Sequence, residues 1–311
     1  MKAVKAGEKG SVGTFIFVLI LLIGLFLVCL PRIHSHHYSP VIRQKAQFHS
    51  MEAGIELIKS ELKRYPPSDA NDSADRPYCG AMKLCEAMMG RDLLGFHPKS
   101  VFNQDGTDST GNEVYSSDRN NLQSRKGPYL PLETANAFNL SDIYGKGNTG
   151  LFLEDLYVLC DTNKQKRSTG KKTGMPVLYY LADPNGTAHD PNFPDDPNNI
   201  YDYRDNQAIL ELGVPGNPDM KHPMTDPKVF YEITRKQYQY DVIGKPSSYI
   251  LVSAGTDGLY GTKDDVFNYF WLPHRSDALT AQCNNCCGER RAQCRSAKQD
   301  ASKSRLYAAV W

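Results

Sequence analysis

The sequence has almost no net charge and lacks the short motifs that mark common enzymes. Its 36 Lys and Arg residues balance 35 Asp and Glu residues, for a formal net charge of +1. This balance argues against binding of nucleic acid through bulk electrostatics. No Walker loop, nucleophile elbow, zinc-protease helix or dinucleotide fingerprint is present, and the glycine-rich segment 145–150 lacks the closing Lys-Ser/Thr pair of a phosphate loop. We therefore expect a protein that is not an enzyme and binds no nucleic acid.

The near-zero total hides three regions of different charge. Residues 1–45 carry a net charge of +5, residues 46–271 carry −8, and residues 272–311 carry +4. The basic start indicates a membrane anchor, and the acidic middle indicates a body that could hold a cation. The basic end indicates a tail that differs from the body in composition.

One long apolar run lies near the start of the chain. Residues 12–30 contain no charged side chain, and at about 1.5 Å per residue a helix of this length reaches roughly the thickness of the hydrocarbon layer of a bilayer. A cleaved signal peptide is the alternative, but small residues are absent just after the run. We expect an uncleaved single-pass anchor, with the short N-terminus in the cytoplasm and the body on the other side of the membrane.

An amphipathic stem follows the anchor. Pro31 is expected to close the first helix, and Ser39-Pro40 supplies an N-cap and a first-turn proline that would start a second one. Apolar residues then recur at helical spacing on one stripe: Val41, Phe48, Met51, Ile55, Ile58 and Leu62. The segment 65–67, Tyr-Pro-Pro, should end the stem.

This N-terminal arrangement resembles type IV pilin-like proteins, and most closely the pseudopilins of type II secretion. In that family a short basic leader ends in glycine, a peptidase cuts after it, and the new N-terminus is methylated. Lys9-Gly10 fits the leader, so the resemblance places processing between Gly10 and Ser11. The family's glutamate, which neutralises a neighbouring subunit's N-terminus inside the membrane, is missing from the residues that follow Ser11.

A second, more local resemblance covers residues 247–270, which read as a strand, a glycine-rich acidic loop and a second strand. The segment is similar to the C-terminal part of major pseudopilins, where the loop binds calcium. The resemblance implies Asp257, Asp264 and Asp265 as carboxylate ligands, with Ser253 as a further oxygen donor. Glycines at 255, 258 and 261 would let the backbone turn sharply. The alternative is a β-hairpin with a solvated polar turn; an EF-hand is excluded by spacing.

The resemblance implies a structural subunit of a type II secretion or type IV pilus-like assembly in the inner (cytoplasmic) membrane, with its body in the periplasm. Its partners would be other pilin-like subunits, membrane proteins of the secretion machinery, and membrane lipid. The missing glutamate favours an alternative, which is a permanently tethered extracytoplasmic binding module or enzyme that keeps the stem without forming a filament.

The expected fold class is α+β, with a long N-terminal helix (a transmembrane half plus the amphipathic stem) packed on a small antiparallel β-sheet in a loop-rich body. The sequence predicts a short helix at 77–90 and strands at 156–160, 177–182, 208–212, 249–253 and 266–270. The stretch 190–205, rich in Pro, Asp and Asn, is expected to be an exposed loop. The domain boundaries follow: a leader at 1–10, a transmembrane helix at 11–30, a stem at 31–67, a globular body at 68–272 and a basic tail at 273–311.

The positions of the eight cysteines do not define a single pattern of disulfide pairing. Cys79 and Cys85 lie six residues apart on a predicted helix, on different faces, so we do not expect them to pair. Four more fall in the tail, at 283, 286, 287 and 294. Zinc, disulfides and free thiols all remain open for these four, and the tail itself is either an interaction segment or a disordered extension.

Overall fold

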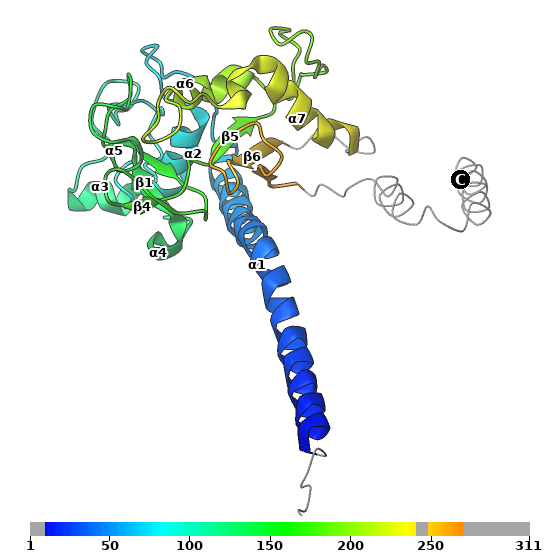
Figure 1. Cartoon of the computed structure of the whole chain (residues 1–311). Coiled ribbons are helices and arrows are strands. Elements are labelled where there is room, and N and C mark those ends of the chain that lie inside the picture. Colours follow the sequence, from blue (N-terminus) through cyan, green and yellow to red (C-terminus); the bar gives the residue numbers. More distant parts are fainter. Residues whose placement is uncertain (1–9, 241–247, 270–311) are drawn as a thin grey trace, which may run out of the picture. The chain divides into compact units, whose positions relative to one another are not determined.

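The computed structural model describes residues 10–240 and 248–269 (Figure 1). The first helix, α1, spans Gly10–Leu62. It runs through Pro31 and Pro40 without interruption, so the predicted break and restart between these prolines are wrong. The helix ends where expected, because Lys63 takes a left-handed backbone conformation (φ 62°) just before Tyr65 and the two prolines that follow it.

The C-terminal part of α1 packs on the body through the predicted apolar stripe. Phe48, Met51, Ile55 and Ile58 are at most 1% exposed, which confirms the helical spacing read from the sequence. Val41 is the exception, since it is 42% exposed. The contact with the body therefore begins C-terminal to Val41.

The predicted membrane anchor has to be corrected. Among the residues that the structure describes, no helix is long and apolar enough to cross a membrane. A span needs about 20 mostly apolar residues in succession within one helix, and the transmembrane helix predicted at 11–30 rested on composition alone. The location predicted from the anchor, a single pass through the inner membrane with the N-terminus in the cytoplasm, is wrong by the same finding.

Helix α2, Gly80–Met89, is the centre of the body. All ten of its residues are buried, and it packs against α1 and against strands of two different sheets (Figure 1). Gly80 allows the closest approach, because a Cβ atom there would lie 2.2 Å from the carbonyl oxygen of Tyr179. The helix predicted at 77–90 is thus confirmed, and it lies in the core rather than on the surface of the body.

The strands form three small antiparallel sheets. β1 (Ala137–Asn139) pairs with β2 (Tyr157–Leu159), and β3 (Gln165–Lys166) pairs with β4 (Lys172–Thr173). The third sheet has the order β5-β6-β7 and is formed by Leu178–Leu181, Tyr249–Ser253 and Val266–Phe267. In its register Leu178 lies opposite Val252, and Ser253 lies opposite Val266.

The predicted fold class, with a transmembrane-capable helix laid across a single small sheet, is therefore wrong. The described residues form a mixed arrangement of helices and three separate sheets, and none of the helices qualifies as a membrane span. The strand predicted at 208–212 lies instead in helix α6, Gln207–Glu211. A short apolar run of this length fits a buried strand or a buried helical turn equally well, so periodicity alone could not decide.

Short helices and loops fill the rest of the body. These elements are α3 (Arg119–Ser124), α4 (Leu132–Ala135), α5 (Leu140–Tyr144), the 3₁₀ helices η1 (Tyr203–Asn206) and η2 (Pro223–Thr225), and α7 (Pro227–Tyr240). One hydrophobic core joins all of these elements except α3 and extends from Phe48 of α1 to Val266 of β7.

Candidate functional site

The loop that connects β6 to β7 is the acidic segment singled out in the sequence. Gly255, Gly258 and Gly261 all have positive φ angles (66°, 75° and 94°), which confirms that the loop needs glycine at these turns. Gly255 also allows a close approach, because a Cβ atom there would lie 2.4 Å from the carbonyl oxygen of Asp264 and 2.6 Å from its Oδ2. The two ends of the loop are thereby held against each other.

Asp264 organises the loop through hydrogen bonds. Its Oδ2 accepts from the backbone nitrogen of Thr256 (2.6 Å), from the Thr256 hydroxyl (2.8 Å) and from the backbone nitrogen of Asp257 (3.1 Å). Its Oδ1 accepts from the hydroxyl of Thr262 at 2.6 Å. Burial raises the pKa of Asp264, but the hydrogen bonds from Thr262 and Thr256 outweigh it and lower the pKa to about 2. This carboxylate is therefore ionised at neutral pH.

The other two aspartates of the loop, Asp257 and Asp265, accept fewer hydrogen bonds that could offset the cost of burying a charge. Burial, followed by the nearby charge of Asp264, raises the pKa of Asp257. Asp265 accepts from the backbone nitrogen of Gly261 through Oδ2 at 2.7 Å, whereas its buried Oδ1 has no hydrogen-bond partner among the described residues. Burial, with the charges of Asp264 and Asp257 adding to it, raises the pKa of Asp265 to about 8. The loop thus holds three carboxyl groups close together in sequence, and none of them forms an ion pair among the described residues.

The structure places the hydroxyl of Ser253 away from these three carboxylates. Its Oγ donates to Oδ2 of Asp161 at 3.0 Å and accepts from the backbone nitrogen of Gly255 at 3.3 Å. Asp161 itself is fully buried, and its Oδ1 accepts from the backbone nitrogen of Asn163 at 3.0 Å. The side-chain amide of Asn163 in turn donates to the carbonyl of Gly255 at 2.9 Å.

Sequence reasoning missed Asp161, which supports the loop from behind. Burial raises its pKa to about 7. The only signal in the sequence is its position directly after the strand predicted at 156–160, where a carboxylate can face either solvent or a neighbouring segment.

The far end of the loop is fixed on η2. The backbone nitrogen of Tyr260 donates to Nδ1 of His222 at 3.4 Å, and the nitrogen of Met224 donates to the carbonyl of Tyr260 at 3.0 Å. His222 is fully buried, and burial lowers its pKa to about 4, so the ring is neutral and can accept this bond. Tyr260 also donates its hydroxyl to the carbonyl of Pro176.

The described residues contain no group of three or more His, Cys, Asp and Glu side chains arranged to hold a metal ion. Calcium does not require such a group, because it takes six to eight oxygens and accepts backbone carbonyls and waters among them. The ionised Asp264 and the unpartnered Oδ1 of Asp265 fit a hard cation, and the glycine turns leave carbonyls as the remaining donors. The chemistry of the donor set is therefore compatible with calcium and not with a metal that needs nitrogen or sulfur ligands.

The remaining predicted residues lie outside this loop. Gly10 and Ser11 are the first two residues of α1. Cys79 and Cys85 are buried free thiols, which confirms that they do not pair, and the tail with its four cysteines at 283–294 lies outside the described residues.

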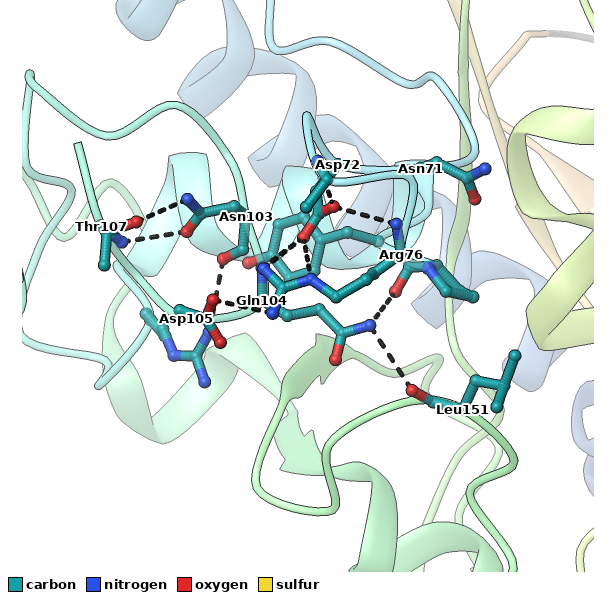
Figure 2. A network of polar contacts seen from close by, with 12 residues as sticks. Asn71, Asp72, Arg76, Asn103, Gln104, Asp105, Thr107 and Leu151 are labelled. Atoms are coloured by element: carbon teal, nitrogen blue, oxygen red, sulfur yellow. Dashed lines mark hydrogen bonds and ion pairs between the residues drawn. The ribbon is translucent and has the colours of Figure 1, made fainter. Parts of the chain in front are cut away.

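A second polar network holds loops of the body together (Figure 2). Asp72 accepts from the backbone nitrogens of Ala74 and Arg76 and from the Arg76 side chain, and it also accepts from the nitrogen of Gln104 at 3.2 Å. Arg76 continues to Asp105 with an ion pair of 2.7 Å. Both carboxylates and the guanidinium of this network have protein partners, so the network ties the loops together.

Comparison with known proteins does not place the chain in a family. No family model, no curated protein and no solved structure matches this chain.

Proposed function

We propose that the protein is a structural, non-enzymatic subunit of a pilin-like assembly of the type II secretion or type IV pilus kind, and that its β6–β7 loop binds calcium. Its partners would be other pilin-like subunits and components of the secretion machinery. The observation that carries the proposal is the loop itself, in which three left-handed glycines surround an ionised Asp264 and an Asp265 with an unpartnered buried oxygen.

Calcium would place positive charge beside the three aspartates, which form no ion pair among the described residues. Asp257, Asp264 and Asp265 would hold the ion, with backbone carbonyls of the glycine turns completing its shell. The hydrogen bonds from Thr256 and Thr262 would keep the Asp264 carboxylate ionised and fix its orientation for the ion.

The loop also controls the surface next to α1, because β7 follows it directly. Lys45 of α1 donates to the carbonyl oxygens of Phe267 (2.5 Å) and Tyr269 (2.6 Å). Glu52 of α1 accepts from the side-chain amide of Asn268 at 3.0 Å. A loop ordered by calcium would therefore fix β7 against the helix that, in the proposed assembly, packs with neighbouring subunits.

Thermal unfolding of the full chain tests the calcium step. Calcium at about a hundred times its dissociation constant should stabilise the protein by about 3 kcal/mol, which corresponds to several degrees in Tm relative to a sample in chelator. The double substitution Asp264→Ala, Asp265→Ala should abolish this difference. Asp108→Ala is the matched control, because Asp108 is also ionised within a tight turn but lies in a different loop. An equal calcium response in the double variant would show that the ligands are misassigned.

A second pair of variants tests the loop geometry while keeping every carboxylate. Gly255→Ala adds a Cβ atom against Asp264, whereas Gly111→Ala adds one into open space at a similar φ angle of 84°. Both variants carry the strain of a left-handed alanine, about 1–2 kcal/mol. Gly255→Ala should in addition lose the calcium response, and Gly111→Ala should keep it.

Mass spectrometry of the mature N-terminus tests membership of the assembly separately from calcium binding. Cleavage between Gly10 and Ser11 with methylation of the new terminus supports pilin-type processing. An intact Met1 in cells that process pilins would contradict the assembly role, even if the loop binds calcium.

A further inference from the structure

A cavity of about 350 Å³ lies apart from the acidic loop. Its lining comes from residues 67–69, from the segment 181–184 after β5, from the stretch 194–205, and from Tyr231 of α7. The volume is at the lower end of the range for sites that bind small molecules or single side chains. No residue of the β6–β7 loop contributes to it.

The cavity wall is rich in carboxylates. Five aspartates line it, together with a single arginine: Asp69, Asp183, Asp196, Asp202, Asp205 and Arg204. Lys83 neutralises Asp69 in an ion pair of 2.5 Å, and Arg204 neutralises Asp202 at 2.8 Å. Within the described part of the chain, the other three carboxylates form no ion pair. The cavity therefore carries an excess of negative charge.

Two buried side chains contribute oxygens to the wall, and one of these oxygens lacks a donor. Asn199 is only 8% exposed, and its amide nitrogen is fixed by the carbonyl oxygens of Phe193 (3.0 Å) and Pro194 (2.9 Å). This arrangement identifies its other terminal atom as Oδ1, which is buried and has no hydrogen-bond partner among the described residues. Asp205 is 7% exposed, and its carboxylate accepts from the hydroxyl of Ser68. An unsatisfied buried acceptor is costly unless a ligand supplies a donor.

Prolines reduce the number of backbone donors in the wall. Four of the lining residues are prolines, at positions 67, 184, 194 and 197, and proline has no N–H group. The hydroxyl of Tyr231 is already engaged, because it donates to the carbonyl oxygens of Pro194 and Tyr201. The cavity thus combines the apolar surfaces of proline rings with oxygens that can accept hydrogen bonds from a ligand.

From this combination we propose that the cavity binds an alkylammonium or alkylguanidinium group, which is the chemistry of a lysine or arginine side chain and of a small free amine. The charged head would donate to Asp205, Asn199 and Asp196, and the aliphatic stem would pack on the proline rings. A bare metal ion fits less well, because it has no aliphatic stem to pack on the four proline rings of the wall. Burial, with the charges of Asp202 and Asp69 adding to it, raises the pKa of Asp205 well above its ordinary value, against the opposing effects of the Ser68 hydrogen bond and of Lys83. The negative charge of the wall therefore rests on Asp183 and Asp196, and a bound cation would shift Asp205 toward its ionised form.

Isothermal titration of the full chain tests this proposal with n-butylguanidinium and n-butylammonium as probes. Both cations should bind, whereas 1-butanol and butyrate, which have the same stem without the positive charge, should not. A short peptide with one arginine, compared with its citrulline counterpart, separates a partner's side chain from a free amine as the source of the group. Equal binding of butanol, or displacement of the amines by millimolar magnesium at constant ionic strength, would overturn the proposal.

Variants locate the binding. Asp196→Asn should weaken n-butylguanidinium binding several-fold. Asp190→Asn is the matched control, because both aspartates accept through Oδ1 from the nitrogen and the side-chain amide of the asparagine two residues on, all at 2.9 Å, and only Asp196 lines the cavity. Asp205→Asn should weaken binding about tenfold. If Asp196→Asn binds as tightly as Asp190→Asn, the cavity is not the site, whether or not Asp205→Asn folds.

Discussion

Glu86 is an ionisable side chain in the core, and three hydroxyl groups donate hydrogen bonds to its carboxylate. It is 2% exposed on α2 and accepts hydrogen bonds from Tyr78 (2.6 Å) and Tyr115 (2.8 Å), and also from Ser100. Burial raises its pKa, and the hydrogen bonds from Ser100 and the two tyrosines only partly oppose that effect. The helix at the centre of the body is thus joined to the loops that carry Tyr78, Ser100 and Tyr115.

Replacing Glu86 with alanine should reduce the free energy of unfolding by about 3 kcal/mol, because the hydroxyls of Tyr78, Ser100 and Tyr115 lose their common acceptor in a buried place. Urea unfolding monitored by circular dichroism measures the change. Glu113→Ala, at an exposed position, should alter the free energy by less than about 0.5 kcal/mol. A similar small effect for both variants would contradict the role given to Glu86.

The raised pKa of Glu86 also predicts a direction for the pH dependence. A carboxyl group whose pKa is higher in the folded chain contributes its full stability below its ordinary value of 4.5 and loses it as the pH rises toward the folded pKa. Glu86→Gln cannot ionise and lacks this loss. The stability of the unmodified protein relative to Glu86→Gln should therefore fall as the pH rises above about 4.5, as measured by urea unfolding at several pH values.

At the scale of elements, α1 joins the body through one face only. Ile55 has no exposed surface, whereas Leu57, two residues further on, is 53% exposed on the same helix. Gly54 lets α1 approach α2, because a Cβ atom there would lie 2.5 Å from the terminal carbon of Met88. The attachment of the helix thus depends on a narrow stripe of side chains.

This asymmetry predicts different costs for truncating two similar side chains of α1. Ile55→Ala leaves a cavity in the core and should reduce the free energy of unfolding by about 2–4 kcal/mol. Leu57→Ala should cost less than about 1 kcal/mol, because most of its side chain stays in solvent in either case. Chemical denaturation compares the two, and equal costs would mean that the face of α1 is wrongly assigned.

At the scale of the whole described molecule, long loops are held in place by polar ties in addition to the core. Asp72 binds the turn around Arg76 to the segment around Gln104, and the side-chain amide of Gln104 reaches the carbonyl oxygens of Pro77 (2.7 Å) and Leu151 (3.5 Å) (Figure 2). Three segments that are distant in sequence are therefore connected through one buried carboxylate.

Asp72→Ala should reduce the free energy of unfolding by about 2 kcal/mol, because it removes a buried acceptor from three backbone nitrogens and from the Arg76 guanidinium. Asp105→Ala is the matched control, since it breaks only the more exposed ion pair of the same arginine, and exposed pairs contribute about 0–1 kcal/mol. Thermal unfolding of the two variants measures the difference. A cost for Asp105→Ala as large as that for Asp72→Ala would assign the tie to the wrong carboxylate.

The sequence determined the features that depend on local spacing. The buried stripe from Phe48 to Ile58, the helix at α2 and the positive φ angles of the glycines in the β6–β7 loop follow from helical periodicity and from the conformational freedom of glycine. The loop's three aspartates were likewise visible in the sequence, because they are close to one another along the chain.

Only the tertiary structure decided what depends on contacts between distant segments. The apolar run at 208–212 became helix rather than strand, and no helix among the described residues became a membrane span. Asp161 came to lie behind the loop 92 residues away, bound to Ser253. Part of the stretch 190–205, predicted as an exposed loop, became a cavity wall with Asn199 buried in it. The reason is that burial and hydrogen-bond partners are set by which segments pack together, and one-dimensional spacing carries little information about that choice.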